Sequence, residues 1–178
     1  MKKLFTICSL AVALVSFSES AKAQTISDTS DPFLLSIDVT TPVISINLQG
    51  SADVSFVYGD ADSYNKPNVV SKPGHFSVIS NRPYEVIAQA GAFTSSSSDE
   101  LALSVVQMTA TRVTGDGTNE TSTTVPLTDG AGQALVVSAP ATTNSVYNID
   151  FSIPSAAPLL DVAAEVYTTS VTYTATQL

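Results

Sequence analysis

From residue 33 onward, apolar and polar residues alternate in short runs, and the helical period of 3.6 residues is absent. Thr, Val, Ser and Tyr dominate these runs, as is typical of a pleated, half-buried surface. We expect strands at residues 34–39, 43–48, 54–58, 76–79, 84–88, 101–113, 121–127, 133–138, 145–153 and 165–176. Turn signals such as Pro73-Gly74 and Asn81-Arg82-Pro83 separate them. Many short strands at this spacing predict an all-β fold, an antiparallel β-sandwich of the Ig-like or pilin-like kind.

The last expected strand has the clearest alternation. Residues 167, 169, 171, 173 and 175 share one face, and every residue between them, from 168 to 176, is Thr or Ser. One packed face and one wet face are typical of an antiparallel sheet over a core. We therefore expect this strand to be central to the fold. The only stretch that suits a helical turn is 156–164, and Pro154 and Pro158 disfavour even that.

The N-terminus has the three parts of an export signal. Lys2 and Lys3 precede an apolar run over 4–17, and Ala21-Lys22-Ala23 supplies two small residues for cleavage before Gln24. The apolar run is shorter than the roughly 20 residues that a membrane span requires. Cys8 lies inside that run, which disfavours a lipid anchor. We predict a signal peptide at 1–23, a flexible tail at 24–32, a β-sandwich domain at 33–178, and no membrane insertion of the mature chain.

The net negative charge of the chain disfavours two classes of partner, nucleic acid and anionic lipid. The chain has 16 acidic and 7 basic residues. Removal of 1–23 takes three lysines and one glutamate, which leaves the predicted mature chain a net charge of −11. Such a surface repels nucleic acid and anionic lipid, because both are bound through Lys and Arg. The only cysteine leaves with the signal, so stability must come from packing and strand pairing.

Catalytic chemistry has little support. His75 is the only histidine; it follows the expected turn at Pro73-Gly74, where an exposed polar role is the more common one. No serine stands in a Gly-x-Ser-x-Gly elbow. We therefore predict a protein that is not an enzyme, with no catalytic residue and no cofactor.

Acidic residues in the expected loops are candidate cation ligands. Asp60 and Asp62 are similar to the start of a calcium loop, but Tyr64 and Asn65 stand where an oxygen ligand and a glycine belong. Further oxygen donors on expected loops are Asp99, Glu100 and Asp116. Acidic side chains commonly cap turns and keep loops hydrated. The sequence therefore predicts no metal site.

Glycan binding would need exposed aromatic rings. Tyr64, in a polar loop, is the tyrosine that we expect to be exposed, whereas Tyr167 and Tyr173 share the expected core face of the last strand. There is no tryptophan. A single exposed ring is a weak sugar platform, so glycan binding stays an alternative.

Two stretches carry a resemblance. Residues 76–88 form a strand, a Ser-Asn turn, an aromatic residue and a second strand, and 166–176 form a long closing strand. Together they resemble secreted bacterial β-sandwich surface proteins, including fimbrial-subunit-like and WxL-like domains. The Trp-x-Leu signature is missing, so cell-wall binding is not implied. Together with the expected export signal, the resemblance implies a secreted or cell-surface location, with the periplasm as an alternative.

Exposed sheet edges invite pairing with another chain. The Thr-rich last strand and the N-terminal segment are suitable donors for strand addition to other protein subunits. The leading hypothesis is a non-catalytic secreted bacterial surface or extracellular structural protein, a fimbria-like, filament-like or adhesive subunit. The alternative is a β-sandwich module that binds glycans or proteins.

Overall fold

The computed structural model describes residues 34–97, 99–115 and 121–178. The chain divides into two units, 1–37 and 38–178, and only 34–37 of the first are described. The predicted signal peptide, the predicted tail and Asp116 lie outside the described residues.

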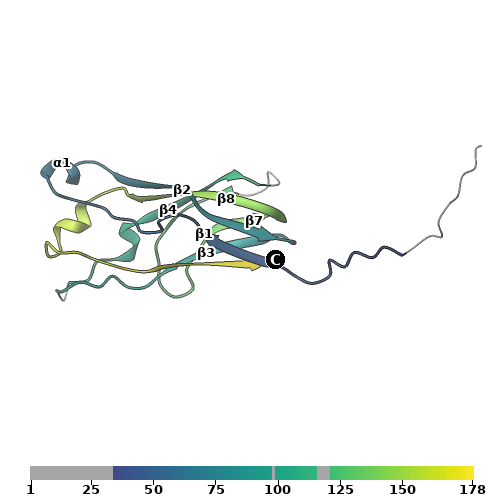
Figure 1. Cartoon of the computed structure of the whole chain (residues 1–178). Helices are drawn as coiled ribbons and strands as arrows, with labels where there is room; N and C mark the ends of the chain where they lie inside the picture. The colour runs from purple at the N-terminus through teal and green to yellow at the C-terminus, as the bar shows by residue number, and fades with distance from the viewer. Residues whose placement is uncertain (1–33, 98, 116–120) are drawn as a thin grey trace, which may run out of the picture. The chain divides into compact units, whose positions relative to one another are not determined.

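The second unit is built from two antiparallel sheets (Figure 1). The first has the order β1 (Ile44–Leu48), β2 (Asn68–Ser80), β8 (Thr142–Ile153), β4 (Gln107–Thr114) and β6 (Thr124–Pro126). The second has the order β5 (Thr121–Ser122), β7 (Gln133–Ala139), β3 (Tyr84–Ala90) and β9 (Val171–Gln177). The predicted all-β class is confirmed.

Both sheets contribute side chains to one core. In Figure 1, β3 and β9 lie on one side of it, and β2 and β8 lie on the other. Phe76 of β2, Met108 of β4 and Leu135 of β7 are fully buried. The hydroxyls of Tyr84 and Tyr147 lie 2.8 Å apart in the core and form a hydrogen bond between the sheets. This bond satisfies two polar groups that would otherwise be costly to bury.

In the part of the chain that the structure describes, three short helical turns connect the strands. The helix α1 (Ala61–Tyr64) was not predicted, the 3-10 turn η1 (Leu103–Val105) lies within an expected strand, and η2 (Ala157–Leu160) lies where a helical turn was judged doubtful. Among the described residues, no helix is both long and apolar enough to cross a membrane.

The expected turn at Pro73-Gly74 is wrong, because both residues lie within β2. Gly74 has a φ of +57°, and its N–H donates to Asn148 Oδ1 at 2.7 Å. The pairing of β2 with β8 shifts between Lys72 and Phe76. A proline followed by a left-handed glycine therefore makes a bulge here, and the strand continues beyond it.

Two expected strands, 34–39 and 54–58, belong to no sheet. Residues 34–39 have exposed side chains throughout. In 54–58 the alternation is real: Val54, Phe56 and Tyr58 pack against the core, and the two residues between them are exposed. The alternation correctly predicted which of these side chains face the core, but these residues form no hydrogen-bonded ladder with another strand.

The expected strand 121–127 is divided between the sheets. Its first part, β5, pairs with β7, and its second part, β6, pairs with β4. The chain then crosses from β4 back toward β3. Leu127 N–H donates to the Val106 carbonyl before β4, and the Thr128 carbonyl accepts from Ala90 N–H at the end of β3. This crossing places residues 127–129 next to the end of β3.

The expected last strand is shorter than predicted and lies at an edge. β9 stands at the end of its sheet and is paired with β3 alone, so the strand that was expected to be central to the fold is an edge strand. Residues 165–170 precede it and are held by an isolated bridge between Thr168 and Thr94. The predicted facing is confirmed for β9, since Val171, Tyr173 and Ala175 pack against the core.

Candidate functional site

His75 is not the exposed turn residue that the sequence predicts, because only 3% of its surface is exposed. Its ring makes edge contacts with Phe151 of β8 at 5.7 Å and with Tyr173 of β9 at 5.6 Å between ring centroids. Its Nδ1 is buried and has no hydrogen-bond partner among the residues that the structure describes. Burial lowers the pKa of His75 below its ordinary value, and the positive charge of Lys72 lowers it further.

Tyr173 faces His75 from the other sheet. Its hydroxyl is buried and also has no hydrogen-bond partner in the described part of the chain, and burial raises its pKa far above the ordinary value. The histidine and the tyrosine thus lie among aromatic rings, and they meet where the edge strand β9 packs on β2. This cluster is part of the packing between the sheets.

The acidic candidates lie apart from one another. Asp60 is the N-cap of α1, and its Oδ1 accepts a hydrogen bond from Ser63 N–H at 2.8 Å. Asp62 lies in the first turn of that helix. Asp99 Oδ2 accepts from Ala163 N–H at 2.8 Å, which ties two loops together. In the described part of the chain, no three His, Cys, Asp or Glu side chains gather as metal ligands would.

Tyr64 lies at the end of α1 with about a third of its surface exposed (36%). Its ring packs on Tyr58, with centroids 5.0 Å apart at 51°. One face of Tyr64 is therefore used to hold α1 against the preceding segment. Burial raises the pKa of Tyr58 above its ordinary value. Tyr167, the other tyrosine expected on the last strand, instead donates its hydroxyl to the Ala163 carbonyl in the preceding loop.

The segment before β1 carries exposed apolar side chains. Leu34 is 92% exposed, and Leu35, Ile37 and Val39 are about three-quarters exposed. Leu35, Ile37 and Val39 alternate with Ser36 and Asp38, the pattern of one apolar strand face. No strand of the structure includes these residues.

The same segment is fixed at its C-terminal end. Asn81 holds it from the β2–β3 turn: its Nδ2 donates to the Thr41 carbonyl, and its Oδ1 accepts from Val43 N–H. Gln177, the last residue of β9, donates from its amide to the Val43 carbonyl at 2.8 Å. The chain therefore enters β1 beside the C-terminal end of β9 (Figure 1).

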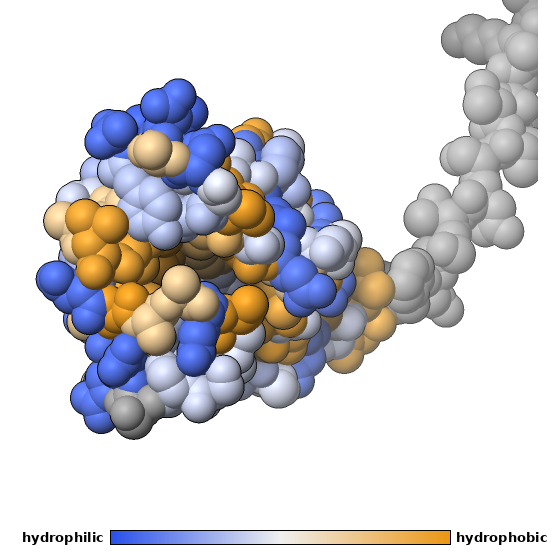
Figure 2. Space-filling view, turned by 90° about the vertical axis from the view of Figure 1, so that its left-hand side faces the viewer, coloured by the Kyte–Doolittle hydropathy of each residue, from blue (hydrophilic) through white to orange (hydrophobic). Residues whose placement is uncertain are grey.

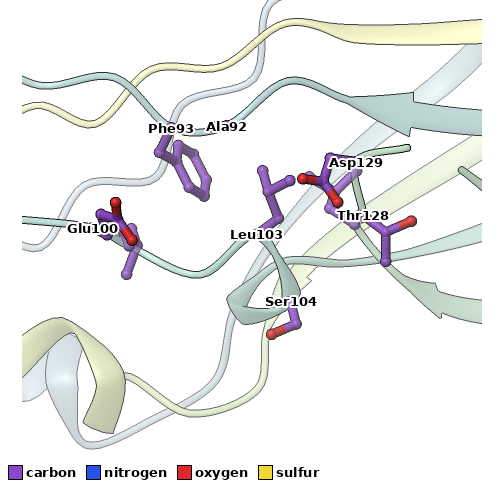
Figure 3. Close-up of a pocket in the computed structure, with 9 residues that line it drawn as sticks. Ala92, Phe93, Glu100, Leu103, Ser104, Thr128 and Asp129 are labelled. Atoms are coloured by element: carbon purple, nitrogen blue, oxygen red, sulfur yellow. The ribbon is translucent and has the colours of Figure 1, made fainter. Parts of the chain in front are cut away.

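A hollow of about 410 Å³ is lined by three stretches of the chain. They are the loop after β3, the residues at and just before η1, and the crossing at 127–129. Its apolar lining includes Phe93, Leu101, Leu103 and Leu127, and its acidic lining is Glu100 and Asp129. Figure 3 shows Phe93 and Leu103 between the two carboxylates. Of these residues, the sequence singled out only Glu100, because three separate stretches form the hollow and two of them were expected to be wholly or partly strand, at 101–113 and 121–127.

Hydrophobic residues also surround a hollow on the end of the β unit that carries α1 (Figure 2). Apolar residues are exposed in nearby η2 and the loop after it, namely Leu160 and Val166.

Searches among protein families and among curated proteins find no match to this chain. The function must therefore be argued from its own residues.

Proposed function

We propose that this chain is a non-catalytic, secreted bacterial surface or extracellular structural protein that joins other subunits by strand addition. In this proposal the two sheets form an Ig-like or pilin-like sandwich, residues 1–23 are an export signal, and the mature chain is a filament-like or adhesive subunit. The histidine and the acidic residues have structural roles in this interpretation: His75 packs in the core, and Asp60 and Asp99 hold loops.

The observation that carries the proposal is the segment before β1. Leu35, Ile37 and Val39 form the apolar half of an alternating pattern and are about three-quarters exposed. Burial of such a side chain is worth roughly 1.5–3 kcal/mol, so three of them in a partner would give a substantial driving force. A strand that keeps its pattern but has no sheet of its own suits donation to another chain.

Sheet edges offer a place for such a strand. β9 ends one sheet and β1 ends the other, and both edges lie beside the point where the segment enters the unit. An edge strand presents unpaired N–H and C=O groups on its outer side. A donor strand would satisfy these groups and bury its apolar face at the same time.

The test is the assembly state of the secreted chain, measured by light scattering after size exclusion and by negative-stain electron microscopy. We expect concentration-dependent polymers. Ile37→Asp should abolish them, because it places a charge on the apolar face of the donor. Ser36→Asp is the matched control on the other face and should leave assembly intact. A chain that stays monomeric at about 100 μM, a concentration at which any contact with a Kd in the low micromolar range would be mostly formed, would overturn the proposal.

A further inference from the structure

The hollow beside the end of β3 combines an apolar surface with charge of one sign. Phe93, Leu101 and Leu103 line it while also packing against the core, so their positions are fixed by the fold. Leu127, also in the lining, is almost fully buried. The volume of about 410 Å³ lies within the range of small-molecule sites, about 300–1,000 Å³. A small organic ligand would fit a space of this size.

Both charged residues of the lining are acidic. In the described parts of the chain, no hydrogen bond or ion pair engages the side-chain carboxylate of Glu100 or Asp129. The four basic residues of those parts are absent from the lining; they are Lys66, Lys72, Arg82 and Arg112. Among the described residues, no basic side chain therefore compensates the charge in the hollow, and this charge adds to a chain that is acidic as a whole.

The arrangement of these groups is specific. In Figure 3 the Phe93 ring and the Leu103 side chain occupy the middle, with Glu100 on one side of them and Asp129 on the other. A ligand lying along this line meets an apolar surface in its middle and a carboxylate at each end.

We propose that this hollow binds an organic cation with an apolar body, such as an alkylamine or an alkyl diamine. The alkyl part displaces water from Phe93 and Leu103, and each ammonium group lies beside a carboxylate. An alkyl carboxylate of the same length would meet repulsion at both ends, and a neutral alcohol would gain only the apolar contact. This binding is independent of strand addition, because none of the lining residues belongs to the segment before β1 or to the edges of β1 and β9.

The test is a calorimetric titration of the whole secreted chain with four ligands of one length: octylamine, 1,8-diaminooctane, 1-octanol and octanoate. We expect the two amines to bind more tightly than octanol and octanoate to bind least. Each exposed ion pair contributes a few-fold in affinity, so the preference for octylamine over octanol should be roughly threefold to fivefold. It should shrink as salt is raised, because salt screens exposed charges.

Variants separate the two parts of the interaction. The double change Glu100→Gln and Asp129→Asn should remove the preference for amines and leave octanol binding unchanged, whereas Leu103→Ser should weaken all ligands. Asp53→Asn, which removes an exposed acidic group outside the lining, is the control for overall charge and should leave the preference intact. Equal affinity for the amine and the alcohol, or an amine preference that survives the double change, would overturn the proposal.

Discussion

Residues 54–58 and β9 have the same alternation of apolar and polar residues, and in both the apolar side chains pack against the core. β9 also has a ladder, with seven residues paired to β3 from Tyr84↔Gln177 to Ala90↔Val171. Residues 54–58 have none. Side-chain alternation therefore determines which way residues face, whereas a ladder depends on a neighbouring backbone with regularly spaced free groups.

The neighbouring backbone explains the difference. The pairing of β1 with β2 ends at Leu48↔Phe76, and one further bond joins Gln49 N–H to the His75 carbonyl. Beyond that point β2 contains Pro73, which has no N–H, and Gly74, whose N–H is directed to Asn148. The regular ladder stops at this bulge, and the chain continues past it in extended form.

The largest expected effect is at Tyr173 in β9. Its ring lies 5.1 Å from that of Phe76 and packs on the core. Tyr173→Ala should lower the free energy of unfolding by about 3 kcal/mol, as is typical for truncation of a packed aromatic residue. Thr174→Ala, on the exposed face next to it, should change it by less than about 0.5 kcal/mol. Urea denaturation measures both, and equal effects would contradict the facing of β9.

A further change at the same position separates the ring from its hydroxyl. The Tyr173 hydroxyl is buried without a partner, and burial of an unbonded polar group is unfavourable. Tyr173→Phe keeps the ring and should not lower the free energy of unfolding. A loss as large as that of Tyr173→Ala would mean that the hydroxyl is bonded in solution.

A smaller effect is expected at Phe56 in the stretch without a ladder. Phe56 is half-buried, so Phe56→Ala should lower the free energy of unfolding by about 2 kcal/mol. Val57→Ala changes a side chain that is 73% exposed and is the matched control, with an effect of less than about 0.5 kcal/mol.

Hydrogen exchange sharpens the comparison, because the amides of 54–58 lack ladder bonds and should exchange faster than those of β9. Equal protection of the two stretches would contradict the absence of a ladder.

The contrast between residues 54–58 and β9 also explains how much of the fold the sequence predicts. Periodicity located β1, β3, β7, β8 and the facing of β9, because those features depend on local alternation. It failed at Pro73-Gly74, since a turn and a bulge use the same two residue types, and only the pairing with β8 distinguishes them. That error also misplaced His75, which was expected in a turn. The hollow at Phe93, Leu103 and Asp129 depends on how three loops meet, and no local pattern encodes that.

The smallest expected effect is a change with pH in the free energy of unfolding, and it comes from His75 at the contact between β2 and β9. His75 lies against Tyr173 of β9 and Phe151 of β8, and Lys72 is the charged group that acts on it. Its pKa in the folded protein is lowered from 6.5, mainly by burial. The unfolded chain therefore binds this proton more readily. The stabilisation is complete above pH 6.5 and is lost as the pH falls from 6.5 through the folded pKa.

Each pH unit in that window can cost at most about 1.4 kcal/mol for one proton. The acidic residues titrate as well, so the informative quantity is the difference between the natural chain and His75→Gln, measured by urea denaturation from pH 7.5 to 5. The two stability curves should converge or cross as the pH falls, because only the natural chain takes up the His75 proton on unfolding. The protection factors of the β9 amides, which compare their exchange with the intrinsic rate at each pH, should fall over the same range in the natural chain alone, since the added charge lies against Tyr173. Parallel curves would mean that His75 is as accessible to protons in the folded protein as in the unfolded chain, and its burial between the sheets would then be wrong.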